Sequence, residues 1–262
     1  MTTINVAWSF RGINLHGTNW NISMLSPSEV VPGRRGDNIV VPGLDGRIFR
    51  AKAMDQRVVS LAMFVKGTSG SALEADLETL KALLGQPGQG VLSRTVPGRT
   101  AWSINAEVAN VVDWQPTSHL SYKAVIEFLC ADPYWSGAQY EQIEGAAPGP
   151  ITTSPHSWTI VNNGTAINER PLIYIGGDIT NPKLTCGDFW LQYTGAVVAG
   201  NTLAINCLNF TAEYINANVV ANITHGGGVP WMRFAPGNNT FTLEGTGLTD
   251  VIVTTRFTEL WL

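Results

Sequence analysis

Two long segments of the chain, residues 100–114 and 119–131, alternate between apolar and polar side chains. The apolar positions are Trp102, Ile104, Ala106, Val108, Val112 and Trp114 in the first segment, interrupted only by Asn110, and Leu120, Tyr122, Ala124, Ile126, Phe128 and Cys130 in the second. A period of two indicates a β-strand with one buried face. At about 3.3 Å per residue, each strand would be about 43 Å long, roughly twice the usual length. We predict a long hairpin that turns at residues 115–118, with edges that pair with further copies of the chain and close a pore.

Further strand patterns precede this hairpin. Ile4–Phe10 and Trp20–Met24 alternate in the same way, on either side of a glycine-containing turn at Gly12–Gly17. Residues 39–49 contain two short strand patterns around Asp45-Gly46. Residues 55–66 are apolar at both odd and even positions, which predicts a strand that is covered on both faces.

One helix is predicted, from Ser71 to Leu84. Ser71 and Glu74 have the spacing of a capping box, and Gly85 is placed to end the helix. The leucines fall on one stripe of the helix, at positions Leu73, Leu77, Leu80 and Leu84. Such a stripe is typical of a helix that packs on a sheet, and we interpret it as core.

The pattern changes near Gly137, and from there on only short strand patterns recur. They are Trp158–Val161, Leu172–Ile175, Phe189–Tyr193, Thr202–Cys207, Ala217–Ile223, Thr240–Leu243 and Val251–Phe257, and Gly- or Asn-rich turn signals such as Gly176-Gly177 separate them. This spacing favours an antiparallel β-sandwich. We therefore predict a mainly β protein with two domains, residues 1–137 with one α-helix and residues 138–262 without one.

Composition adds three expectations. Only 14% of the residues are charged and nine are Trp, which suits a protein that hides surface in contacts with neighbours, and equally a Gly- and Asn-rich β protein of modest solubility. The net charge is −4, and the sequence has no basic patch of the kind that binds nucleic acid. The three cysteines have no metal-site spacing, and no signal peptide or membrane-spanning run is visible, so we expect synthesis in a reducing cytoplasm and no membrane partner.

No catalytic constellation is visible in the sequence. His225 and the three glycines after it resemble the oxyanion-hole loop of lipases, but no G-x-S-x-G motif and no α/β pattern accompany them. P-loop and H-E-x-x-H motifs are missing, and the four histidines are dispersed. The sequence therefore predicts no enzymatic activity, no cofactor and no metal site.

A stretch rich in arginine is the strongest candidate for a binding surface. Within residues 34–57 six cations, Arg34, Arg35, Arg47, Arg50, Lys52 and Arg57, accompany the three anions Asp37, Asp45 and Asp55. Arginine is enriched where planar, bidentate contacts cross an interface. We therefore predict an inter-subunit contact made by Arg34, Arg35, Asp37, Arg47 and Arg50. The alternative is an ordinary solvated loop.

Several segments, taken in order, resemble the distal tail proteins of bacteriophages with long non-contractile tails. They are Trp8–Leu15, the loop Pro32–Arg47, the single capped helix after a buried strand, Phe128–Gly137, Asn162–Ala166, Arg170–Lys183 and Pro230–Asn239. The resemblance covers essentially the whole chain, and its specificity comes from the order and spacing of the segments rather than from any single one.

The resemblance implies a fold and a role. The first domain would be a tail-tube-like β-sandwich or barrel, and the second a galectin-like antiparallel β-sandwich. Six copies would form a ring in the virion, at the distal end of the tail. This ring would join the tail tube protein to the tip hub, the tape-measure protein and host-binding proteins. Phage DNA would pass through it without specific binding, and assembly would take place in the cytoplasm of the bacterial host.

The second domain also favours an alternative function, a carbohydrate-binding adhesin module of the tail tip. Its Trp158, Trp190 and Trp231 are candidates for stacking against sugar rings. Aromatic residues of a sandwich more often belong to its core, so both interpretations stand at this point.

Overall fold

The part of the chain that the structure describes is mainly β with one α-helix, as predicted. The computed structural model describes residues 6–22, 31–39, 42, 45, 49, 52–109, 112–146, 149–228 and 231–262. The chain divides into two compact units, Met1–Ser136 with Leu262 and Gly137–Trp261. In the part of the chain that the structure describes, each helix is too short or too polar to cross a membrane.

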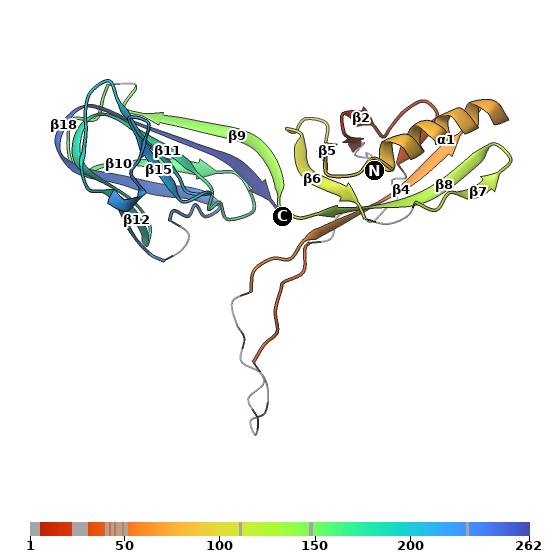
Figure 1. Ribbon diagram of the computed structural model, residues 1–262, viewed down its shortest axis with the longest axis horizontal. Coiled ribbons are helices and arrows are strands. Elements are labelled where there is room, and N and C mark those ends of the chain that lie inside the picture. The colour runs from red at the N-terminus through yellow and green to blue at the C-terminus, as the bar shows by residue number, and fades with distance from the viewer. Residues whose placement is uncertain are drawn as a thin grey trace. The chain divides into compact units, whose positions relative to one another are not determined.

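The first unit contains two small antiparallel sheets and the helix (Figure 1). Its strands are β1 (Ala7–Phe10), β2 (Ile13–Asn14), β3 (Trp20–Ile22), β4 (Arg57–Lys66), β5 (Gly90–Thr95), β6 (Trp102–Val108), β7 (Gln115–Ser118), β8 (Ser121–Cys130) and the start of β9 (Trp135–Glu144). One sheet pairs β2, β1, β5 and β6, and the other pairs β3, β4, β8 and β7. Arg11 and Gly12 both have positive φ, as a tight hairpin turn between β1 and β2 requires.

The predicted long hairpin is only partly right. Strand β8 occupies its second half, but the strand of the first half, β6, ends at Val108, and the predicted turn at 115–118 is strand β7. The true turn lies at residues 119–120. Ser118 Oγ lies 2.6 Å from Ser121 Oγ and accepts a hydrogen bond from the Leu120 N–H at 3.3 Å, so serine side chains close it. Strand β6 pairs mainly with β5 and reaches β8 only at Glu107 and Val108.

Helix α1 (Gly70–Leu84) buries the predicted leucine stripe together with Leu83 and lies along β4 (Figure 1). Its predicted end is confirmed, because the Gly85 N–H donates to Lys81 O at 2.8 Å. The predicted cap is wrong: Ser69, not Ser71, accepts the Ala72 N–H at 3.2 Å. Residue 67 must be glycine for this start, because a Cβ there would lie 2.5 Å from the Leu73 side chain.

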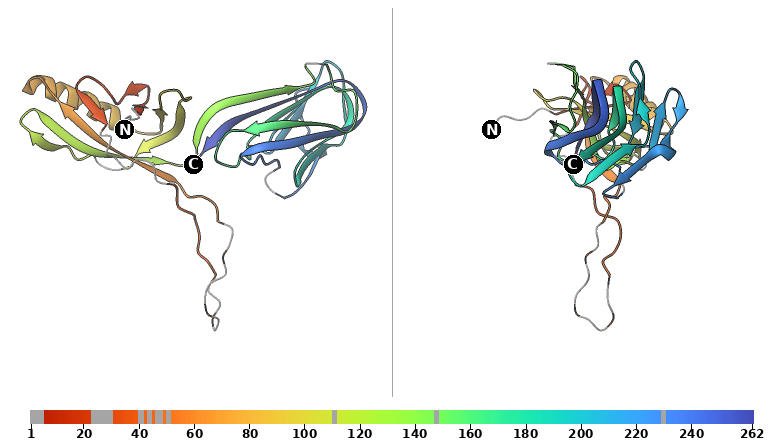
Figure 2. Two further views of the ribbon diagram at one scale, coloured as in Figure 1. Left: turned by 180° about the vertical axis from the view of Figure 1, so that it is seen from behind. Right: turned by 90° about the vertical axis from the view of Figure 1, so that its left-hand side faces the viewer.

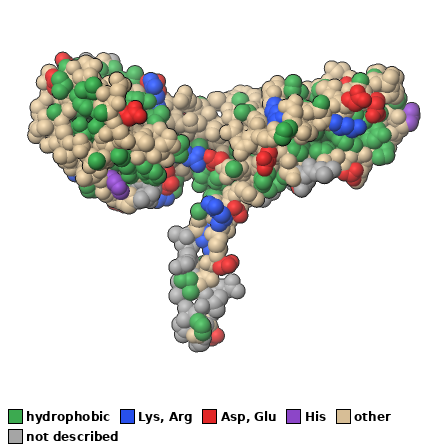
Figure 3. Space-filling model, in the orientation of Figure 1, with side chains coloured by type: hydrophobic (Ala, Val, Ile, Leu, Met, Phe, Trp, Pro, Cys, Tyr) green, Lys and Arg blue, Asp and Glu red, His purple; other side chains and the backbone are tan. Residues whose placement is uncertain are grey.

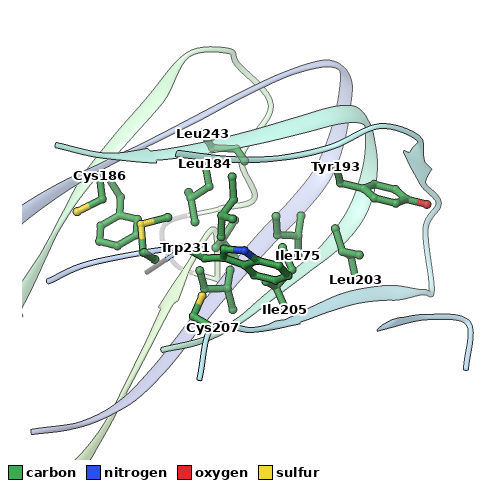
Figure 4. Packing of buried hydrophobic residues seen from close by; sticks show 14 of the residues in the cluster. Ile175, Leu184, Cys186, Tyr193, Leu203, Ile205, Cys207, Trp231 and Leu243 are labelled. Carbon is green, nitrogen blue, oxygen red and sulfur yellow. The ribbon is translucent and has the colours of Figure 1, made fainter. Parts of the chain in front are cut away.

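The second unit is a β-sandwich. Its elements are β9 (Trp135–Glu144), β10 (His156–Asn162), β11 (Leu172–Cys186), β12 (Phe189–Tyr193), β13 (Ala196–Val197), β14 (Thr202–Asn206), β15 (Thr211–Tyr214), β16 (Ala217–Asn218), the 3₁₀ turn η1 (Val220–Asn222), β17 (Ile223–Gly226) and β18 (Gly237–Trp261). One sheet contains β14 to β16 and the other contains β10, β12 and β17, while β11 and β18 run through both. Side chains of both sheets, among them Ile175, Leu184 and Leu243, pack in one core (Figure 4).

One predicted turn and one predicted separation of strands in this unit are wrong. Gly176-Gly177 does not end a strand, because β11 continues through it to Cys186, and the patterns at 240–243 and 251–257 both belong to β18. The register of β11 against β18 shifts between Gly176 and Lys183. These irregularities bend the long strands from one sheet into the other, and Gly177, at φ +96°, supplies the required backbone. The strand predicted at 217–223 is β16 followed by η1.

All three cysteines are free and buried, which predicts unreactive thiols. Burial raises the pKa of Cys130 and of Cys186 from 9.0 to about 11, and that of Cys207 to about 12. We expect iodoacetamide at neutral pH to modify none of them in the native protein and all three in denaturant, as counted by mass spectrometry. Labelling of any cysteine in the native protein would contradict the prediction that the thiols are unreactive.

The raised thiol pKa values also predict a pH dependence of stability. From about pH 9 upward the unfolded chain loses thiol protons that the folded chain keeps, so the free energy of unfolding should fall as pH rises toward 11.

Candidate inter-subunit surface

The arginine-rich stretch forms a paired arm that leads into β4. The Arg35 N–H donates to Ala53 O at 2.9 Å, the Asp55 N–H donates to Gly33 O at 2.8 Å, and Arg34 lies opposite Met54. The runs 31–39 and 52–56 therefore lie side by side, as Figure 2 shows. We call these two runs the arm.

The predicted contact residues on the arm that the structure describes are exposed. Arg34 donates through Nη1 to Lys52 O at 3.3 Å, and Arg35 Nε lies 4.0 Å from the carboxylate of Asp55. The Arg35 and Asp55 side chains are 68% and 49% exposed, so this ion pair is largely screened by water. Asp37 is exposed, and Arg47 and Arg50 lie outside the described residues. Cationic and anionic side chains thus both lie on the arm (Figure 3) and remain available to a neighbour.

Arg57 does not belong to this surface, although it is part of the same arginine-rich stretch. It is buried at the start of β4, where Nε donates to Pro133 O at 2.9 Å and the guanidinium lies 5.9 Å from the centre of the Trp135 ring. Arg57 therefore anchors the base of the arm in the core of the first unit.

Strands β4 and β8 present a second exposed surface, which the sequence did not identify as a site. Val58 lies opposite Leu129, and Ala62 lies opposite Val125 in the register of the two strands. Together with Phe64, these residues form what we call the β4–β8 outer face. The side chains of Val58, Phe64 and Val125 are 42%, 40% and 59% exposed. Three large apolar side chains in water on one sheet face are characteristic of a surface that a partner covers.

The opposite face of the same two strands is core. Val59, Leu61 and Met63 of β4 are buried beneath α1, and the ring of Phe128 in β8 packs 4.9 Å from that of Phe10. Because side chains alternate across a strand, the chain cannot bury both rows against one helix. The prediction that residues 55–66 are covered on both faces is therefore wrong within the single chain, where the described residues cover only one face.

A hollow beside the outer face adds shape to this surface. It has a volume of about 280 Å³, and its lining includes Ala62, Gln115, Lys123 and Val125. Its sides come from β4, β7 and β8, so it lies wholly in the first unit. A hollow of this size can accept a large side chain from a partner.

The three tryptophans predicted to stack on sugars have unequal positions. Trp158 and Trp231 are 8% and 6% exposed in the core of the second unit, and Trp158 stacks on Phe241 at 5.7 Å. Neither ring therefore offers a face to a ligand. Trp190 is partly exposed, but the Lys183 ammonium lies 5.7 Å from its ring centre, and Gly226 lies directly under the indole.

Among the described residues, no group of three or more His, Cys, Asp or Glu side chains could hold a metal ion. His225 lies in β17, and its ring is 5.8 Å from that of Trp231.

No protein-family model matches the sequence, and no curated protein is significantly similar to it. The crystal structure of the Dit protein of phage SPP1 superimposes over 98% of this chain and 100% of its own, with a TM-score of 0.71 and 15% identity. The chain has the fold of SPP1 Dit. That protein is described as a paradigm of the hub adsorption apparatus in phages that infect Gram-positive bacteria.

The resemblance to distal tail proteins that we stated from the sequence is thereby confirmed for the Dit fold. A chain of the phage P2 baseplate in its activated conformation with Ca also aligns over 97% of this chain, at 9% identity and a TM-score of 0.43. This second likeness is too weak to add to the Dit comparison.

Proposed function

We propose that the protein is a virion structural protein that forms a hexameric ring at the distal end of a phage tail. The ring joins the tail tube to the tip hub and the tape-measure protein, and its channel lets DNA pass without specific binding. The number six and these partners come from the family resemblance. The fold shared with SPP1 Dit along both whole chains supports the assignment, and the role is architectural rather than enzymatic.

The observation that carries this proposal is the β4–β8 outer face. A free monomer would leave Val58, Phe64 and Val125 in water, whereas burial of apolar surface contributes about 25 cal/mol per Å². We therefore assign this face to the contact between neighbouring copies of the chain. Each contact is modest, and the closed ring adds them together.

The arm supplies the polar part of the same proposal. Its backbone pairing holds Arg34 and Arg35 at fixed positions, while their side chains remain exposed. An arginine in this setting can make bidentate contacts with carboxylates of the next copy or of a tail partner. Such contacts set register and orientation more than affinity.

The experiment that tests the proposal is mass photometry with negative-stain images of the purified protein, alone and with tube and tip proteins. We expect rings for the wild type. An Arg34, Arg35 and Arg47→Glu triple variant should assemble poorly, because it turns three cations of the arginine-rich stretch into anions, while its circular dichroism spectrum stays unchanged.

A matched control carries the same change of charge at exposed cations elsewhere, namely Lys81, Arg99 and Arg233→Glu. This control should still form rings. If the arginine variant also forms rings, the arginine-rich stretch is an ordinary solvated loop and makes no contact between copies. A wild type that remains monomeric even with tube and tip proteins would overturn the ring itself.

The alternative function, a carbohydrate-binding adhesin through Trp158, Trp190 and Trp231, has less support. Two of the three rings lie in the core, so no joint stacking platform is formed. We keep the distal tail ring as the proposed function.

A further inference from the structure

The second unit carries an open groove on the outer side of its β14-containing sheet. The groove has a volume of about 560 Å³. It lies over β11, β14 and β18, and its polar lining includes Tyr174, Asn201, Thr202, Asp250, Thr254 and Arg256. This size is within the usual range for small-molecule sites.

The floor of the groove is low because Gly176 has no side chain. Gly176 lies between Thr202 of β14 and Ile252 of β18 in the register of the sheet. A Cβ at this position would meet no atom closer than 3.7 Å, so the space above it is open rather than filled by a neighbour. Tyr174 and Thr254 lie opposite one another one step further along.

One rim of the groove is fixed by hydrogen bonds from outside it. The Ala199 N–H donates to Asp178 Oδ1 at 2.7 Å, and the Val198 N–H donates to the Tyr214 hydroxyl at 3.0 Å. The Asn201 N–H then donates to Val198 O at 3.0 Å and closes the turn. Asn201 and Thr202 are thus held in position before any ligand arrives, which lowers the entropic cost of binding.

The cationic side of the groove is also held in position. Arg256 donates through Nη2 to Glu141 Oε1 at 3.0 Å, and its guanidinium lies 5.2 Å from the centre of the Tyr174 ring. A guanidinium has five N–H donors in a rigid fork, so a single fixed contact orients donors toward further acceptors.

The chemistry of the lining selects a ligand class. Arg256 provides donors, Asp250 provides acceptors, and Asn201, Thr202 and Thr254 provide both. Ile252 and the Tyr174 ring add apolar surface. Arg256 already donates to Glu141, and Asp250 adds a second carboxylate to the lining, so the site does not favour a phosphate or another anion. A sugar ring has hydroxyls that both donate and accept, together with apolar C–H faces.

We propose that this groove binds a neutral saccharide. The site is separate from Trp158, Trp190 and Trp231. The proposal goes beyond the ring function and does not depend on it, because every lining residue belongs to the second unit.

The test uses the full-length protein on a glycan microarray, with saturation-transfer NMR on galactose, glucose, mannose and N-acetylglucosamine. We expect binding to neutral glycans, and amide shift changes at residues 174–176, 200–202 and 250–256. Thr202→Trp fills the groove from an exposed strand position and should abolish binding. Arg256→Gln should weaken it at least about tenfold, the effect of losing one hydrogen bond to a charged group.

The chain offers a matched control in Lys183→Gln. Lys183 also pairs with a glutamate, Glu244 at 3.1 Å, and lies 5.7 Å from an aromatic ring, that of Trp190, but outside the groove. The Lys183→Gln protein should bind saccharide like the wild type. A microarray that shows no glycan binding, together with no saturation transfer, would overturn the proposal. Binding that survives Thr202→Trp, or that is lost only in Lys183→Gln, would overturn it as well. Binding restricted to anionic glycans or to peptides would also overturn it.

Discussion

Replacing both Phe64 and Val125 by Asp is expected to convert rings into monomers. Both side chains belong to the β4–β8 outer face and are 40% and 59% exposed in the single chain. In a ring, each new carboxylate would be buried without a partner, which costs about 3–5 kcal/mol. The loss repeats at every contact around the ring, so this is the largest effect that we predict on assembly. Mass photometry measures it directly.

The control for this variant uses the same substitution on other exposed valines. Val91 in β5 and Val161 in β10 are 48% and 37% exposed, and neither belongs to the outer face. The Val91 and Val161→Asp protein should form rings as the wild type does. Thermal unfolding of both double variants checks that the monomers still fold. If the Phe64 and Val125 variant forms normal rings, another surface joins the copies.

Replacing Phe241 by Ala is expected to have the largest effect on stability. The Phe241 ring is fully buried in the second unit, 5.0 Å from that of Phe234 and 5.7 Å from that of Trp158. Truncation leaves a cavity beside the buried rings of Trp158 and Phe234, so we expect the free energy of unfolding to fall by about 3–5 kcal/mol. Urea unfolding followed by tryptophan fluorescence measures this.

Leu208→Ala is the comparison for this stability prediction. Leu208 is 53% exposed after β14, and its truncation should change the free energy of unfolding by less than about 0.5 kcal/mol. Equal destabilisation by the two substitutions would mean that the rings around Phe241 do not form the structural centre of the second unit.

The two proposals, ring and saccharide groove, have separate readouts. The ring depends on the arm and the β4–β8 outer face of the first unit, whereas the groove lies entirely in the second unit. Variants of Phe64 and Val125 should therefore retain glycan binding per chain. Variants of Thr202 and Arg256 should still form rings. The assignment of a tail-tube-like first domain and a galectin-like second domain remains a prediction.

Local pattern predicted elements well where a single periodicity was strong. The leucine stripe gave α1, and alternation gave β8 and β12. The local pattern failed where a glycine pair could belong either to a turn or to a bulge within a strand. Gly176-Gly177 has the composition of a turn, yet it lies inside β11, because a glycine with positive φ serves a bulge as well as a turn.

The candidate sites were only partly visible in the sequence. The arm was found through its arginines, although Arg57 proved to be a core residue. The outer face had a signal in the sequence, because residues 58–65 are apolar at both odd and even positions. This pattern predicts burial of both faces, whereas the single chain buries only one. The groove had no local signal, because Tyr174, Thr202 and Arg256 are far apart in the sequence and meet only when β11, β14 and β18 pair.

The sequence by itself determined which residues could form strands, where the one helix ends and that the chain is mainly β, because these features depend on neighbours within a few positions. The tertiary structure decided which of two apolar rows on β4 is buried and which side chains gather around Gly176. A strand always presents two faces, and only the packing of distant segments determines which of them is left for a partner.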